Sequence, residues 1–293
     1  SLQKMIGRFE FDINSLSDLP NFVPGNPIHD SGIQYVFGEF GGYDAKKLEQ
    51  DATFPIDFFA RLKFRDEAST EKMIEYFAGP EANPSIAGGV ALLRVAGQES
   101  YQQGLWILPL NNCSFEIGTK SQLLHRQFFS AGGSLEQIWE KLESGKTRIA
   151  IDNRGNEIGR VLAVFTRVFN GGFWDQYIKK LELVDHIRAS LDFSREECLK
   201  VIFHATSSKD TLNFWLKLDE LRFECWQEAF RRLGKTPQKT QKEGIREATE
   251  GLSDGLLGLL GLFGLSTISA DYETFETTFS FPKAILEKAR SKN

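Results

Sequence analysis

Apolar and charged residues alternate along several short segments in the first 118 residues of the chain. In residues 6–13 (IGRFEFDI) the apolar side chains recur largely at every second position, with charged residues between them. Successive side chains of a strand point to opposite faces, so this alternation predicts half-buried β-strands. Four further segments repeat the pattern and are expected to be strands: 32–40, 56–64, 90–95 and 105–110.

One helix is expected among these strands. Ser69 is a residue type that often caps a helix, apolar residues follow it at helical spacing, and Gly79 is a typical stop signal. Residues 16–30 contain three prolines and a glycine, which predicts a loop. Strands interrupted by a single helix predict a β-rich α+β domain over residues 1–118, not a βαβ repeat.

Helical spacing dominates from about Thr119 onward. Apolar residues repeat at three- and four-residue intervals over 135–142, 158–169 and 173–191, and Ser194 is placed to cap a further helix. Short strands are expected at 148–151 and 272–281, and a basic helix after Pro282.

Residues 212–218 are ambiguous, because their leucines and phenylalanine alternate like a strand although the continuation to Phe230 fits a helix. We expect a helix from Leu218 onward. The predicted fold class is therefore α+β, with a β-rich N-terminal half followed by a mostly helical C-terminal half that ends in a strand. The second predicted domain, 119–293, contains a basic loop at 231–246 and a Gly/Leu-rich segment at 255–265.

Composition adds two constraints. The chain has 25 Phe and 2 Met, so either aromatic rings dominate its core or the composition of its genome favours phenylalanine. The formal net charge is −5, but residues 1–118 contain 16 acidic and 9 basic residues, a balance of −7, while the remainder comes to +2. Any polyanionic partner is therefore expected to meet the second half.

The cysteines and apolar segments indicate the compartment. Cys113, Cys198 and Cys225 are odd in number and far apart, so we expect reduced, mostly buried thiols and no disulfide framework. The first residues lack the apolar stretch of a secretory signal, and the longest apolar run, 255–265, is shorter than the roughly 18–20 residues of a spanning helix. We expect a soluble, cytoplasmic protein without a membrane partner.

Motifs for catalysis or cofactor binding are weak. Two Gly-Lys-Thr triplets, at 145–147 and 234–236, match the end of a phosphate loop, but Glu140 and Ala229 occupy the positions of its first glycine. No histidine pair has the spacing of a helical zinc site, so no metal or cofactor is expected. His29 and Asp30, in the proline-rich loop, form the one pair that could act as an oriented base.

The segment 231–246 carries six basic residues and one acidic residue. Lysine and arginine on an exposed segment can neutralise phosphates, and Trp226 and Phe230 precede it as stacking groups. A solvated linker explains the same composition. The candidate nucleic-acid-binding residues are Arg231, Arg232, Lys235, Lys239, Lys242 and Arg246.

Glycines recur every three residues in GLLGLLGLFGL, residues 255–265, which contains no charge. The spacing allows close backbone approach, as in a buried hairpin or a tightly packed helix. A loop that docks into a partner and a segment that inserts into a membrane are the alternatives.

These observations favour a protein without catalytic chemistry of its own. We expect a non-catalytic subunit or adaptor of a larger assembly that works through protein–protein contacts, because an uncharged apolar segment lies near a basic one. One alternative is an accessory subunit that contacts nucleic acid through 231–246. The other is an enzyme whose site assembles only in space in the N-terminal half, around His29 and Asp30.

Overall fold

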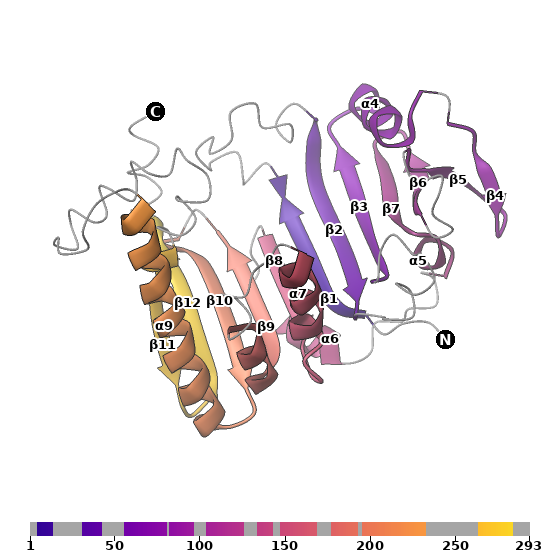
Figure 1. Ribbon diagram of the computed structural model, residues 1–293. Helices are drawn as coiled ribbons and strands as arrows, with labels where there is room; N and C mark the ends of the chain where they lie inside the picture. Colours follow the sequence, from indigo (N-terminus) through magenta and orange to yellow (C-terminus); the bar gives the residue numbers. More distant parts are fainter. Residues whose placement is uncertain are drawn as a thin grey trace. The chain divides into compact units, whose positions relative to one another are not determined.

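The computed structural model of the chain contains two compact units (Figure 1). Described residues up to Asp152 belong to unit 1, and those from Asn153 onward belong to unit 2. The residues that the structure describes are 5–13, 31–42, 56–80, 82–96, 104–125, 134–142, 147–168, 177–192, 195–232 and 263–283.

Unit 1 is built on antiparallel strands. They are β1 (Met5–Asp12), β2 (Ile33–Gly41), β3 (Phe58–Phe64), β4 (Ser85–Ala87), β5 (Val90–Arg94), β6 (Leu105–Asn111), β7 (Ser114–Thr119) and β8 (Thr147–Asp152). Their spatial order is β8-β1-β2-β3-β7-β6-β5-β4, with antiparallel pairing between neighbours. The strands expected from alternation in the first 118 residues are therefore confirmed, as is the short strand at 148–151.

Two glycines of this sheet lie opposite phenylalanines of the neighbouring strand. Gly7 of β1 pairs with Phe40 of β2, and Phe9 of β1 pairs with Gly38 of β2. A Cβ atom on Gly7 would lie 2.0 Å from the ring of Phe40, and one on Gly38 would lie 2.4 Å from the ring of Phe9. Each ring thus covers the glycine beside it, which fills the space that the missing side chain leaves.

Helix α4 (Glu67–Ala78) begins two residues before the predicted cap, Ser69. The carboxylate of Asp66 accepts a hydrogen bond from the backbone N–H of Ser69 at 2.8 Å, so Asp66 is the N-cap and the prediction of Ser69 is wrong. Gly79, at φ +85°, ends the helix as predicted. The other described helices of unit 1 are α5 (Lys120–His125) and α6 (Ser134–Glu140).

Aromatic rings form the centre of the unit 1 core. Phe64 and Phe115 are almost fully buried and stack with ring centroids 5.2 Å apart. Phe77 of α4 meets Phe115 edge-on at 6.3 Å, which joins the helix to the sheet. Leu62, Ala78 and Ile107 complete the cluster. Both the stacked and the edge-on arrangements are favourable ring geometries.

Unit 2 also contains an antiparallel sheet. Its strands are β9 (Val184–Leu191), β10 (Glu197–Ala205), β11 (Thr267–Asp271) and β12 (Glu276–Pro282), in the spatial order β11-β12-β10-β9. Its helices are α7 (Glu157–Val168), the 3-10 helix η2 (Lys179–Leu183) and α9 (Ser208–Arg232).

The mostly helical C-terminal half is therefore wrong, and with it the α+β class as predicted: the protein is dominated by antiparallel sheet in both units. The helix expected over 173–191 is replaced at its end by η2 and β9, and Ser194 precedes β10. The error has a structural cause. Strand pairing gives Val184 opposite Ala205 and His186 opposite His204, so Asp185 is the extra residue of a β-bulge.

The bulge shifts the alternation of β9 by one residue. Val184 and Ile187 are consequently both buried although they lie three residues apart, which is helical spacing. In β10 the neighbouring strands β9 and β12 decide the structure, because pairing on both edges outweighs the local helix signal.

Asn153 connects three elements at the start of unit 2. Its side chain is fully buried, and its Nδ2 donates to the carbonyls of Leu181 at 2.8 Å and Val184 at 2.7 Å. Its Oδ1 accepts the backbone N–H of Ile158 at 2.9 Å. One amide side chain therefore holds η2, the start of β9 and the first turn of α7 together.

Candidate protein-interaction surface

The side chain of Ser207 caps the start of helix α9. The Oγ of Ser207 accepts the backbone N–H of Asp210 at 3.2 Å and donates to the Asp210 carboxylate at 2.7 Å. Hydrogen bonds from Ser207 and Thr206 hold the pKa of Asp210 below its ordinary value. The helix then runs without a break to Arg232, so residues 212–218 are helical and not a strand.

One face of α9 packs into unit 2. The buried side chains on this face are Thr211, Phe214, Leu221 and Cys225. The ring of Phe214 lies 4.9 Å from that of Phe203 in β10, and Leu221 and Cys225 pack with Tyr177. Burial raises the pKa of the Cys225 thiol to about 11.

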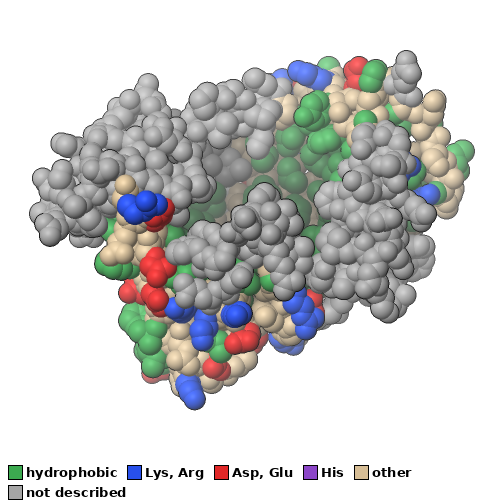
Figure 2. All heavy atoms as spheres, in the orientation of Figure 1, with side chains coloured by type: hydrophobic (Ala, Val, Ile, Leu, Met, Phe, Trp, Pro, Cys, Tyr) green, Lys and Arg blue, Asp and Glu red, His purple; other side chains and the backbone are tan. Residues whose placement is uncertain are grey.

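The opposite face of α9 exposes three large apolar side chains. Leu212, Leu216 and Phe223 are 40%, 52% and 56% exposed. Their spacing of four and seven residues places them on one side of a helix, and we call them the α9 stripe. In Figure 2 hydrophobic and acidic side chains alternate over the surface where Figure 1 shows α9.

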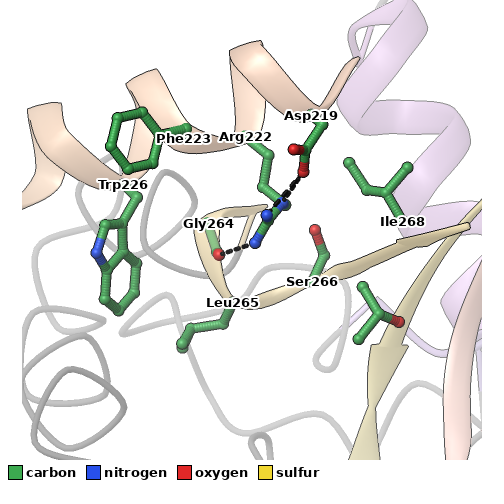
Figure 3. Close-up of a pocket in the computed structure, with 9 residues that line it drawn as sticks. Asp219, Arg222, Phe223, Trp226, Gly264, Leu265, Ser266 and Ile268 are labelled. Atoms are coloured by element: carbon green, nitrogen blue, oxygen red, sulfur yellow. Dashed lines mark hydrogen bonds and ion pairs between the residues drawn. The ribbon is translucent and has the colours of Figure 1, made fainter. Parts of the chain in front are cut away.

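A cavity of about 510 Å³ adjoins the stripe. It lies between α9 and residues 264–268, and Phe223, Trp226, Leu265 and Ile268 give it apolar walls (Figure 3). This volume falls within the range of small-molecule and side-chain pockets.

Arg222 crosses this cavity from α9. Its guanidinium donates to the carboxylate of Asp219 at 2.9 and 2.7 Å, and to the carbonyl of Gly264 at 3.4 Å (Figure 3). The charge of Arg222 is therefore balanced within its own helix, and the polar part of the wall is already hydrogen-bonded.

Gly264 is the one described glycine of the four that repeat in 255–265. A Cβ at this position would lie 2.8 Å from the indole ring of Trp226 and 3.1 Å from its Cα. The close approach that the glycine spacing predicts is thus present at Gly264. Gly255, Gly258 and Gly261 lie outside the described residues.

Ion pairs neutralise most charges along the exposed side of α9. Lys217 binds Glu220 at 2.6 Å, and Arg231 binds Glu228 through two nitrogens at 2.7 Å. With the pair described for Arg222, this gives three pairs spaced by three residues. Exposed pairs of this kind add little stability, but they leave the α9 stripe without a strong net charge.

Few of the residues predicted to bind nucleic acid can be located. Arg231 lies on the last turn of α9, where its partner is Glu228, and Arg232 is the final residue of the helix. Lys235, Lys239, Lys242 and Arg246 lie outside the described residues. Nucleic-acid contact through this segment therefore stays a prediction.

His29 and Asp30, the pair predicted as an oriented general base in the N-terminal half, also lie outside the described residues. Among the residues that are described, one group of three side chains could hold a metal ion: Asp185, His186 and His204 of β9 and β10. Burial acts to raise the pKa of Asp185, but hydrogen bonds and charges from both histidines outweigh it and lower that pKa. Sequence spacing could not reveal this group, since the strand register brings its members together.

The residues of the α9 stripe could have been found from sequence. Ser207 and Asp210 have the spacing of a capping box, and a helix that begins there places Leu212, Leu216 and Phe223 on one face.

Cys113, Cys198 and Cys225 are free thiols. Within the described ranges, no helix has the length and apolar character needed to cross a bilayer.

Comparisons with known proteins give little further information. No protein-family model and no curated protein matches the chain. One solved structure that it resembles is "Structure of crystal form I of TP0453", at 10% sequence identity and a TM-score of 0.42, covering 99% of this chain and 94% of that chain. At this TM-score the likeness carries no argument about function.

Proposed function

We propose that this chain is a non-catalytic subunit that assembles with protein chains through the α9 stripe, and that a second copy of the chain occupies the stripe. The observation that carries the proposal is the alignment of three exposed large apolar residues on a helix whose other face is buried. Exposed apolar side chains that line up in this way are typical of contact surfaces.

The stripe is self-complementary when two α9 helices run antiparallel. With the twofold axis between Lys217 and Leu218, Leu212 of one copy lies opposite Phe223 of the other. Leu212 then stands at the mouth of the cavity that Phe223 and Trp226 line. Both copies contribute the same residues, as an isologous interface requires.

The charges of α9 are compatible with this pairing. The ion pairs of Lys217, Arg222 and Arg231 each cancel within one helix, so two identical faces approach without strong repulsion. A partner that relied on charge steering would need an excess of one sign, which α9 does not present.

The short stripe limits the strength of the dimer. Its two ends, Leu212 and Phe223, are eleven residues apart in sequence, which corresponds to about 16 Å along the helix. The buried area is then below the roughly 1,200–2,000 Å² of stable complexes, so we expect a Kd on the order of 0.1 mM.

Sedimentation velocity over a range of concentrations tests this proposal. The unmodified chain should shift from monomer to dimer as concentration rises, and Leu216→Gln should stay monomeric. Ile86→Gln is the matched control, because Ile86 is 81% exposed but lies on β4 of unit 1. A chain that stays monomeric at every concentration, or an equal effect of both substitutions, would overturn the proposal.

We also propose a reducing compartment such as the cytoplasm. This is supported by the three free cysteines, of which Cys198 and Cys225 are buried.

Nucleic-acid contact through the basic segment is the weaker alternative, because Arg231 is already paired with Glu228. A steep loss of affinity with salt, flattened by replacing Lys235, Lys239 and Lys242, would favour it.

A further inference from the structure

The β-bulge of β9 turns a carboxylate toward a pair of histidines. His186 and His204 are direct partners in neighbouring antiparallel strands, so their side chains share one face of the sheet. Asp185, next to His186, would normally point to the other face. Because Asp185 is the extra residue of the bulge, its side chain is redirected to the face of the two rings.

The three side chains meet at one oxygen. Oδ1 of Asp185 lies 2.8 Å from Nδ1 of His186 and 2.9 Å from Nδ1 of His204. The two imidazoles stack with centroids 4.3 Å apart, at an interplanar angle of 18°. The backbone holds this arrangement, since the carbonyl of Asp185 accepts the N–H of Asn153 at 2.8 Å.

We infer that Asp185, His186 and His204 bind a divalent transition-metal ion such as zinc. Two imidazole nitrogens and one carboxylate oxygen are ligand types that zinc favours, and three protein ligands leave a position for water. Ligand atoms of a tetrahedral zinc site lie about 3.3 Å apart. The two separations between Asp185 and the histidines are a few tenths of an ångström shorter, so the ion replaces the two shared protons as these distances widen. Because an imidazole lone pair lies in the plane of its ring, the two stacked rings must also turn toward one point for both Nδ1 atoms to face the ion.

The surroundings fit a site that an ion can reach. The side chains of Asp185, His186 and His204 are between 13% and 26% exposed, which leaves a path from solvent. Glu276 lies opposite His204 in β12, but it is bound to Arg188, and this pair is neutral as a whole. The ring of Phe275 meets that of His204 edge-on and shields one side.

Cobalt and zinc titrations of the whole chain test the inference. The protein is first freed of metal with a chelator and dialysed. Isothermal titration with ZnCl2 should then show one bound equivalent, and CoCl2 should give the visible absorption bands of a tetrahedral nitrogen and oxygen site. These measurements on the unmodified chain do not depend on how any variant folds.

Substitutions then locate the ion. Asp185→Asn and His204→Gln should each weaken zinc binding by at least about tenfold, since even the loss of an outer-shell partner has this effect. His125→Gln, in α5 of unit 1, is the matched control and should bind as the unmodified chain does. Circular dichroism checks that each variant keeps its secondary structure.

Three results would overturn the inference: no zinc binding by the unmodified chain above background, zinc binding by Asp185→Asn and His204→Gln as tight as that of the unmodified chain, or an intense thiolate charge-transfer band with cobalt. The last result would place the ion on cysteine. None of them bears on the α9 stripe, because β9 and β10 carry the site and Leu216 does not contribute to it.

Discussion

Replacing Phe115 tests whether aromatic rings dominate the stability of unit 1. Its side chain is fully buried between Phe64 and Phe77. Phe115→Ala removes the hydrophobic transfer energy of a whole ring and leaves a cavity, and such changes cost about 3–5 kcal/mol. Phe115→Leu refills part of this space and should cost about 1–1.5 kcal/mol.

Urea unfolding followed by tryptophan fluorescence measures these losses. Trp106 and Trp139 lie in unit 1 and report on it. A double-mutant cycle with Phe64→Leu isolates the stacking interaction, expected at about 0.5–1.5 kcal/mol. Tyr76→Ala is the control, because Tyr76 is 76% exposed, and it should change stability by no more than about 0.5 kcal/mol. If Phe115→Ala costs less than about 1 kcal/mol, the aromatic core does not stabilise the unit as argued.

Four further predictions concern single residues. Hydrogen bonds from Ser69 lower the pKa of Asp66 to about 2. The ionised Asp66 carboxylate therefore stabilises the fold fully above about pH 4, and this stabilisation is lost as the pH falls toward 2. The difference in urea midpoint between the unmodified chain and Asp66→Ala should shrink over that interval. Gly118→Ala would place a Cβ 2.4 Å from a backbone oxygen of β3 and should cost about 1–3 kcal/mol by the same unfolding assay. Asn153→Ala leaves two backbone carbonyls and one backbone N–H without their side-chain partner, so calorimetry or urea unfolding should show that the free energy of unfolding falls by roughly 2–4 kcal/mol. Burial and a pKa of about 11 should leave Cys225 unreactive at pH 8 toward an aromatic disulfide reagent that modifies Cys113, as peptide mass mapping would show; equal labelling would contradict this.

The sequence predicted most strands of unit 1 because apolar and polar residues alternate along them, as in residues 6–13, and this alternation is visible without long-range information. Strands β4 and β7 were not predicted, and β7 is buried at most of its positions, so it carries little alternation. The loop signals and the glycine stop at Gly79 are equally local. Asp66 was missed as the cap because Ser69, three residues later, is an equally good capping type.

Unit 2 was predicted poorly because its decisive features are not local. The bulge at Asp185 and the two-sided pairing of β10 depend on strands far away in sequence. The grouping of His186 with His204 depends on the same register, so no spacing rule could have found it. The outer face of α9 is different, since the spacing of Ser207 and Asp210 in the sequence already indicates where this helix begins.

The paired glycines and phenylalanines of β1 and β2 restrict how these strands can align. If β1 slipped by two residues in one direction, Phe9 would come opposite Phe40 and two rings would compete for one space. A slip of two residues in the other direction would bring Gly7 opposite Gly38 and leave a gap without a side chain. Both errors preserve the apolar face, so hydrophobic patterning alone would tolerate them. The difference in size between phenylalanine and glycine therefore favours the observed alignment of β1 and β2 over either slip.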